Sequence, residues 1–384
     1  MNPADEIRGT VGSAIPAPSE TGRLAYVDGL RALAALYVMV VHTFYEPQNG
    51  YYASPLLNHL GFHFGRIAVA VFIVVSGFCL MLPVARRQDR MGSLWRFFQR
   101  RMLRILPPYY CCLALSILFI VLFAHDTTGT VWDNCLPLTP SAILCHVLLV
   151  HDLPLYSGGR INYPLWSIAV EFQIYFLMPL IVLSIRRLRP AATLLWTLAA
   201  GIGLYLAFRS RLEDAAPWYL SLFTMGALAA YGCVHRPDAL SRPQLRQICY
   251  VSCTLLALML LATGSRRYFA YRFALDQLVG AAVALLLAVT FFDSPARPSA
   301  VTRFLSWRPL VRIGLFSYSL YLVHAVAIHA LWLILHRCLR VRPEAMFALL
   351  LACTPLVVGA AWLFHLGCER PFMRMRSTGG ETTA

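Results

Sequence analysis

The 384-residue sequence contains no lysine, and all 33 of its basic residues are arginine. This absence excludes Schiff-base catalysis and phosphate-binding loops that depend on a lysine. Charged residues are also scarce, at 13% of the chain, whereas they make up about a quarter of a typical soluble domain. Because 59% of the residues are hydrophobic and the mean hydropathy is +0.62, the composition predicts an integral membrane protein.

The sequence also gives little evidence for a metal site or for nucleic-acid binding. The 11 cysteines form no C-x-x-C pair and no cysteine–histidine ladder at metal-ligand spacing, so we predict no metal site. The net charge of +15 comes from short arginine clusters between apolar runs. That distribution is typical of membrane topology signals rather than of nucleic-acid binding. Residues 1–23 lack an apolar core, which predicts a flexible cytoplasmic tail rather than a cleaved signal peptide.

Ten apolar runs approach the roughly 20 residues that a helix needs to cross the hydrocarbon core. They cover residues 24–45, 66–85, 105–124, 161–185, 191–208, 218–235, 248–264, 274–292, 313–335 and 345–366. An eleventh run, residues 141–156, is short and interrupted by polar residues, so we expect an interfacial or half-inserted segment. With the N-terminus in the cytoplasm, the inward connections hold 20 arginines and the outward connections hold nine, a bias that predicts two cytoplasmic termini.

The predicted fold is therefore an all-α, polytopic membrane protein with ten transmembrane helices and one short additional segment. Residues 24–366 form a single transmembrane domain, and residues 367–384 form a short cytoplasmic tail. No internal repeat is visible, and this argues against a transporter built from inverted repeats.

Ionisable side chains inside the apolar runs are the first candidates for function, because such groups are costly in a membrane. Arg31 and His42 are eleven residues apart in the first run. On a helix this spacing puts both on one face, about 16 Å apart along the axis. We expect one cavity to contact both. Snorkelling to the interface is the alternative for Arg31, and a structural hydrogen bond is the alternative for His42.

Glu171 is the only acidic residue of its predicted helix. A carboxylate at that depth needs a partner, so it either serves a site or clamps two helices together. Ser167 and Tyr175 lie four residues to either side, on the same helix face. His324 ends the sequence FSYSLYLVH, where a structural hydrogen bond is the alternative to catalysis.

A basic segment, RFFQRRMLRILPPYY, places Arg101 and Arg104 one helical turn apart. Two guanidinium groups at this spacing can hold a phosphate with paired hydrogen bonds. The alternative is that they only mark the cytoplasmic side of the membrane.

Six sequence motifs follow one another along nearly the whole chain: LAYVDGLRALAALYVMVVHTF, GRIAVAVFIVVSGFCL, RFFQRRMLRILPPYY, PLWSIAVEFQIYFLMPLI, GLFSYSLYLVH and ERPF. Together they resemble acyltransferase family 3, whose members are multi-span membrane enzymes that modify bacterial surface glycans, antibiotics and other acceptors. Ile73 departs from the family pattern, which usually has an aromatic residue there, and we expect this packing change to matter little. The resemblance is to the stand-alone form, without the SGNH-type hydrolase-like domain that some members carry.

The resemblance implies an acyl-CoA donor, usually acetyl-CoA, that enters from the cytoplasm. Arg101 and Arg104 match the R-x-x-R element and would bind its phosphates, while Arg31 would lie deeper, towards the pantetheine arm. That arm would run beside the first helix to His42, the expected general base. Glu171 would orient the His42 ring, and an acyl-histidine intermediate is left open. Further residues expected in the substrate cavity are Ser76, Trp166, Tyr175, Tyr318 and His324.

These expectations describe an O-acyltransferase of the bacterial inner membrane. It would move an acetyl group to a sugar hydroxyl of a surface polysaccharide or lipid-linked glycan, as in exopolysaccharide biosynthesis. O-acylation of a small molecule such as a macrolide is the alternative, and a transporter or flippase is the alternative from another class. The expected partners are the acyl-CoA donor, the acceptor and the lipid bilayer, without metal or nucleic acid. A homo-oligomer is left open.

Overall fold

The computed structural model describes residues 24–45, 65–153, 159–208, 215–236, 242–294 and 296–373. The elements of this part of the chain are all helices, as predicted. In chain order they are α1 (Ala25–Tyr45), α3 (Gly65–Arg86), α4 (Leu94–Phe123), η2 (Val131–Cys135), α5 (Pro140–Val147), η3 (Tyr163–Leu165), α6 (Trp166–Arg187), α7 (Pro190–Phe208), α8 (Tyr219–His235), α9 (Arg242–Phe291), α10 (Ala300–Leu305), α11 (Arg308–Gly314), α12 (Ser317–Leu333), η5 (Ile334–Cys338), α13 (Pro343–Ala352), α14 (Thr354–Phe364) and η6 (His365–Glu369).

Within the described residues, 8 helices are long and apolar enough to cross a membrane, or 9 if the bent pair Ala345–Ala352 and Thr354–Met373 is one span. The predicted count of ten is therefore not confirmed. One reason is that α8 has only 17 residues, which gives about 26 Å against the roughly 30 Å of a hydrocarbon core. The other is that the last apolar run is bent by 42°. The predicted orientation of the termini stays a prediction, because residues 1–23 and 374–384 lie outside the described part.

Two antiparallel spans, Arg242–Thr263 and Tyr271–Phe291, make up α9. A straight helix of 50 residues would be about 75 Å long. Arg246, near its start, nevertheless forms an ion pair of 2.7 Å with Asp293, which follows its end. The chain must therefore reverse between the two spans, as the two separate apolar runs in the sequence predict.

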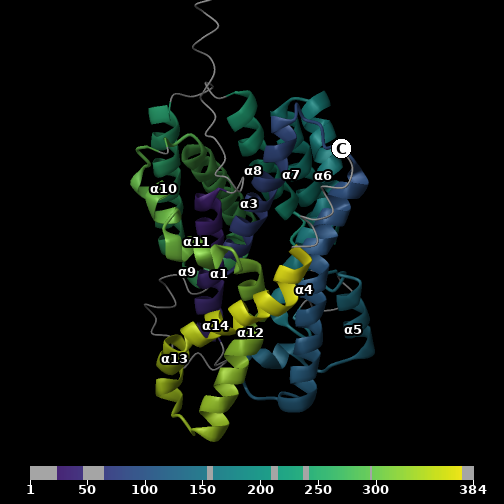
Figure 1. Cartoon of the computed structure of the whole chain (residues 1–384), viewed down its shortest axis with the longest axis vertical. Coiled ribbons are helices and arrows are strands. Elements are labelled where there is room, and N and C mark those ends of the chain that lie inside the picture. Colours follow the sequence, from purple (N-terminus) through teal and green to yellow (C-terminus); the bar gives the residue numbers. More distant parts are fainter. Residues whose placement is uncertain are drawn as a thin grey trace, which may run out of the picture.

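Residues 141–147 of the interrupted run belong to α5, a helix of 8 residues, and residues 154–156 lie outside the described part of the chain. At about 12 Å it cannot cross a membrane. In Figure 1 it lies beside the long helix α4, in the half of the molecule that also holds α12, α13 and α14. Tyr109 and Tyr110 of α4 donate hydrogen bonds to the carbonyls of His146 and Val147, both at 2.8 Å, and so attach α5 to α4.

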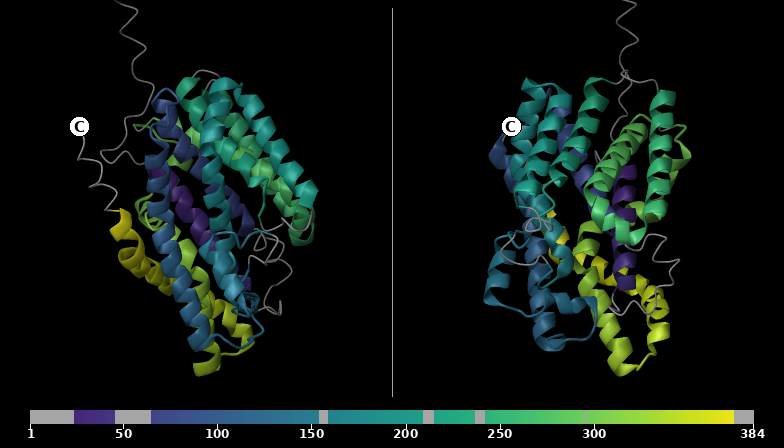
Figure 2. Two further views of the ribbon diagram at one scale, coloured as in Figure 1. Left: turned by 90° about the vertical axis from the view of Figure 1, so that its right-hand side faces the viewer. Right: turned by 180° about the vertical axis from the view of Figure 1, so that it is seen from behind.

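Helix α1 lies in the centre of the bundle and packs against α3, α10, α11, α12 and α13 (Figure 2, purple). Two glycines allow backbone contact at its start. The space where Gly29 would carry a Cβ is taken by the carbonyl of Leu305, and the matching space at Gly314 is taken by the carbonyl of Asp28. These contacts with α10 and α11 fix the first turns of α1, where Arg31 lies.

A second close crossing joins α3 to α8. Gly77 faces the carbonyl of Phe223, and Gly226 faces the carbonyl of Val74, so neither position has room for a side chain. Small residues of this kind let membrane helices approach closely and gain van der Waals contact. The crossing fixes the segment of α3 that carries Ser76.

Candidate active site

A narrow cavity of about 80 Å³ lies inside the bundle, between α1, α3, α4, α6 and α12. We call it the arginine cavity, after the three arginines in its wall. Seven of the ten predicted site residues line it: Arg31 from α1, Ser76 from α3, Arg101 and Arg104 from α4, Glu171 and Tyr175 from α6, and Tyr318 from α12. Residues up to 290 positions apart in the chain, Arg31 and Tyr321, therefore meet at one site.

The arginine cavity carries an excess of positive charge, because three guanidinium groups share its wall with one carboxylate. The guanidinium groups of Arg31 and Arg104 form no hydrogen bond or ion pair with any described residue. The carboxylate of Glu171 instead accepts hydrogen bonds from the hydroxyls of Ser76 and Tyr175, both at 2.5 Å. Unneutralised arginines in a confined site favour an anionic ligand, and phosphate suits the guanidinium geometry best.

Tyr318 holds the turn of α4 that follows Arg104. Its hydroxyl donates a hydrogen bond of 3.1 Å to the backbone carbonyl of Ile105. Pro107 and Pro108 come next in α4, and because proline has no N–H, the helix lacks two of its own hydrogen bonds at this turn. The contact from α12 supports α4 at the place where Arg104 enters the cavity.

His42 and His324 form a histidine pair that lies beside the arginine cavity but does not line it. Their ring centroids are 5.1 Å apart, and the ring of Tyr163 lies 4.9 Å from that of His42. Tyr321 connects the two sites, because it lines the cavity and its backbone carbonyl lies 2.7 Å from Nδ1 of His324. Nδ1 of His42 and Nε2 of His324 are buried without a hydrogen-bond partner. A buried polar atom without a partner calls for an explanation, and a catalytic role is one such explanation.

Two expectations about His42 need correction. A single cavity was expected to contact both Arg31 and His42, but the wall of the arginine cavity includes only Arg31. Glu171 was expected to orient the His42 ring, but its hydrogen bonds go to Ser76 and Tyr175, and Nδ1 of His42 has none. The bond from Ser76 joins α3 to α6. Glu171 thus makes the interhelical contact that the sequence left as its alternative, and it does so within the cavity wall.

Trp166 is the third predicted residue that does not line the arginine cavity. The guanidinium of Arg66 lies over its ring, 4.5 Å from the ring centroid. This is a cation–π contact between α3 and the first residue of α6. Trp166 therefore helps to pack the two helices that carry Ser76 and Glu171.

Glu369 is a buried residue whose contribution the sequence did not reveal. Its carboxylate accepts a hydrogen bond of 2.5 Å from Ser319 and lies 2.8 Å from Nδ1 of His365. It thereby ties η6 to the turn of α12 between Tyr318 and Tyr321. The signal was present in the sequence, since Glu369 is an acidic residue directly after an apolar run.

The fold and the cavity together define a class: a multi-pass membrane protein with three arginines in the wall of one interior cavity and two histidines beside it. Comparison with known proteins supplies the family. The family model for the acyltransferase domain matches residues 24–366. The chain therefore belongs to the acyltransferase 3 family, and it is a membrane acyltransferase.

Individual relatives support the same assignment. The chain is 28% identical to acyltransferase MdmB of Streptomyces mycarofaciens over 389 residues, which cover 93% of this chain and 94% of that protein. It is 23% identical to the peptidoglycan O-acetyltransferase OatA of Listeria monocytogenes over 323 residues, which cover 78% of this chain and 48% of that protein. It is 24% identical to the O-acetyltransferase OatA of Staphylococcus aureus over 323 residues, which cover 78% of this chain and 49% of that protein. The chain thus spans about half the length of the two OatA proteins. No solved structure matches it.

Proposed function

We propose that the protein transfers an acetyl group from acetyl-CoA, whose phosphates bind at the arginines of the arginine cavity, to a sugar hydroxyl that reaches the histidine pair. The observation that carries this proposal is the presence of two unpaired arginines, Arg31 and Arg104, in the cavity wall beside Arg101. Coenzyme A carries phosphates at one end and the thioester at the other. A site with guanidinium groups on one side and imidazoles next to it suits both ends.

His42 is the proposed general base. The acceptor hydroxyl gives its proton to His42, and its oxygen forms a bond to the thioester carbonyl carbon. The carbon–sulfur bond then breaks, and the departing CoA thiolate takes the proton from the imidazolium. Nδ1 of His42 has no hydrogen-bond partner and is the nitrogen we assign to this proton. In the alternative mechanism, the acetyl group is first bonded covalently to His42, as an acyl-histidine intermediate, and is then transferred to the acceptor.

Glu171 is proposed to hold the cavity wall and to limit its positive charge. Its two hydrogen bonds fix Ser76 and Tyr175, which also lie 2.8 Å from each other. One carboxylate among three arginines lowers the cost of assembling like charges when no anion is bound. This assignment follows the observed contacts and replaces a direct role in orienting His42.

We place the arginine cavity on the cytoplasmic side of the inner membrane, because the arginine distribution favours a cytoplasmic N-terminus and acyl-CoA is a cytoplasmic metabolite. His42 then lies about 16 Å further along α1, towards the outer face. The geometry suits an acceptor that enters from outside, such as a surface glycan or a lipid-linked sugar. The Listeria relative is a peptidoglycan O-acetyltransferase, and this supports a glycan acceptor.

A small-molecule hydroxyl is the second candidate acceptor. The similarity to acyltransferase MdmB covers both proteins almost from end to end, whereas the match to the OatA proteins covers about half of each of them. This observation favours an activity that needs only the membrane domain. An experiment with labelled acetyl-CoA distinguishes the two acceptors. A glycan acceptor carries the label into polymer, and a small-molecule acceptor carries it into an extractable product.

Radiolabelled acetyl-CoA supplied to membranes that contain the protein tests the proposal. We expect base-labile label on a glycan fraction or on an extractable small molecule. Replacement of His42 by alanine is expected to lower the rate about 10²- to 10⁴-fold, the usual contribution of a general base. The control His336→Ala alters an exposed histidine of η5 and should leave the rate unchanged. Normal transfer by His42→Ala at equal protein level would refute both versions of the mechanism.

A further inference from the structure

A second cavity, of about 990 Å³, opens between α7, α8 and α9. We call it the α7–α9 groove. None of its lining residues belongs to the arginine cavity. Six of its 17 lining residues are alanine or glycine, namely Ala191, Ala229, Gly232, Ala281, Ala284 and Ala288. Small residues in membrane helices normally permit close helix contact, yet here they border open space.

Helices α8 and α9 touch at one end of the groove and separate towards the other. A Cβ added at Gly280 would come within 2.9 Å of Met225 and 3.1 Å of Leu222, so the two helices are in contact there. Gly232 follows Met225 by seven residues, about 10 Å along α8, and a Cβ at Gly232 would meet nothing within 4 Å. The groove therefore widens towards the C-terminal end of α8, unlike the tight crossing of α3 and α8.

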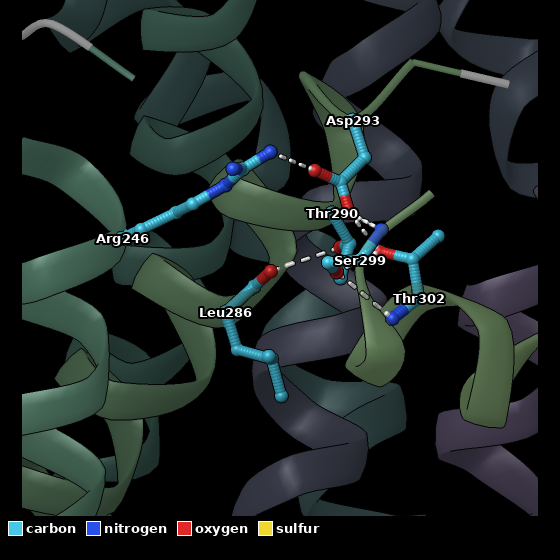
Figure 3. Close-up of polar contacts among 6 residues, drawn as sticks. All are labelled: Arg246, Leu286, Thr290, Asp293, Ser299 and Thr302. Carbon is cyan, nitrogen blue, oxygen red and sulfur yellow. Dashed lines mark hydrogen bonds and ion pairs between the residues drawn. The ribbon is translucent and has the colours of Figure 1, made fainter. Parts of the chain in front are cut away.

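The wide end of the groove carries two arginines, Arg189 before α7 and Arg236 after α8. Both are exposed, and the guanidinium group of neither forms a hydrogen bond or ion pair with a described residue. Arg246, next to the groove residue Leu245, is instead paired with Asp293 (Figure 3). An apolar groove that ends in two unpaired guanidinium groups matches a ligand with a hydrocarbon tail and an anionic head.

We propose that the α7–α9 groove binds an anionic diacyl phospholipid. An acyl chain of the lipid lies in the groove, and its phosphate lies between Arg189 and Arg236. Helix ends of this kind lie at headgroup level, and basic pockets between transmembrane helices bind anionic lipid headgroups. The volume of about 990 Å³ lies at the upper end of the range of roughly 300–1,000 Å³ for small-molecule pockets. A zwitterionic lipid also has a phosphate, but its ammonium group is repelled by the arginines, so the groove prefers a headgroup with net negative charge.

The test uses the full chain, purified in detergent, with phosphatidylglycerol or phosphatidylcholine of identical acyl chains. Native mass spectrometry measures how much of each lipid the protein retains. We expect preferential retention of phosphatidylglycerol. Because each arginine near a lipid phosphate contributes about fivefold in affinity, the double variant Arg189→Ala/Arg236→Ala should bind phosphatidylglycerol about thirtyfold more weakly. The matched control, Arg186→Ala/Arg187→Ala, removes the same charge from α6 outside the groove and should bind like the wild type.

A second pair of variants tests the groove itself. Gly232→Leu fills open space in the groove and should reduce retention of phosphatidylglycerol at least tenfold. Gly203→Leu adds the same side chain at an exposed site of α7 where a Cβ also meets nothing within 4 Å, and it should have no effect. Helical circular dichroism confirms that each variant is folded.

Four results would overturn the proposal. The first is equal retention of the two lipids by the wild type, and the second is unchanged retention by either the double arginine variant or Gly232→Leu. The third is a dimer in light scattering that Gly232→Leu dissociates, which would make the groove a contact between two copies. Millimolar inorganic phosphate that displaces phosphatidylglycerol fully would also contradict a role for the acyl chain.

Discussion

Two regions of this molecule combine arginine with a carboxylate, and they do so in different ways. In the first, at the end of α9, Asp293 accepts hydrogen bonds from the Arg246 guanidinium at 2.7 Å, the Ser299 backbone N–H at 3.1 Å and the Thr302 hydroxyl at 2.5 Å (Figure 3). Burial raises the pKa of Asp293, but the hydrogen bonds from Ser299, Thr302 and Arg246 outweigh this effect, and the pKa lies below its ordinary value. This arrangement is a clamp between α9 and α10.

The second region, the arginine cavity, leaves its positive charge unbalanced. Its single acidic residue, Glu171, is bonded to two hydroxyl groups, while Arg31 and Arg104 have no partner among the described residues. The difference teaches that a saturated arginine–carboxylate pair holds helices in place, whereas unpaired arginines in a cavity wall are available to a ligand. Arginine content alone does not distinguish the two.

Of the changes that separate these two regions, loss of the cavity arginines should give the largest effect. A hydrogen bond to a charged group contributes about 1.5–3 kcal/mol, so Arg104→Ala should raise KM for acetyl-CoA about 10- to 100-fold. The value of kcat should change far less, because Arg104 is assigned to binding. Steady-state kinetics at constant ionic strength measure this split. An unchanged KM would contradict the assignment of Arg104 to the binding of acetyl-CoA.

Removal of the clamp should affect stability instead of activity. Asp293→Asn is expected to lower the free energy of unfolding by about 1–3 kcal/mol at pH 7, because it weakens hydrogen bonds to a buried charged group. The folded pKa lies below the ordinary value of 3.8, so the carboxylate stabilises the fold above about pH 4 and loses this contribution as the pH falls through its folded pKa. The difference between variant and wild type should therefore shrink below pH 4. Thermal unfolding of both proteins in detergent at several pH values measures this difference in stability. A difference that grows as the pH falls would contradict the role of ionised Asp293 as a clamp.

A smaller effect is expected from Glu171→Gln. The glutamine oxygen can still accept hydrogen bonds from Ser76 and Tyr175, but the cavity loses its negative charge. We expect KM for acetyl-CoA to fall about two- to fivefold, as removal of one partly screened charge predicts, with kcat within about threefold of the wild type. A fall in kcat of tenfold or more at constant KM would instead show that Glu171 acts through His42.

Much of the arginine cavity could be predicted from the sequence, because a charged residue in an apolar run needs a polar environment wherever the helix packs. This reason predicts Arg31 and Glu171 as site residues, whereas Arg101 and Arg104 are predicted from their spacing in a basic segment and from the family motif. The structure brings all four together. Their partners could not be predicted. Helical spacing fixes which residues share a face, but the rotation of one helix against another decides whether Glu171 meets His42 or Ser76.

The number of spans shows a similar limit. Hydropathy identified α9 as two spans, because a polar interval separates the two apolar runs. It could not reveal the 42° bend in the last run, where apolar residues continue on both sides of Cys353 and the hydropathy does not change. Hydropathy also overestimated the length of α8, because Trp218 belongs to the apolar run but not to the helix.

The most direct test is a paired measurement of CoA binding and thermal unfolding on three purified variants, Arg31→Ala, Arg104→Ala and Arg246→Ala. The account predicts that the two cavity variants bind CoA at least tenfold more weakly than the wild type and unfold at its temperature. Arg246→Ala should bind CoA normally and unfold at a lower temperature. Normal CoA binding by both cavity variants, or weakened binding by Arg246→Ala alone, would contradict the claim that the unpaired arginines hold the acyl donor.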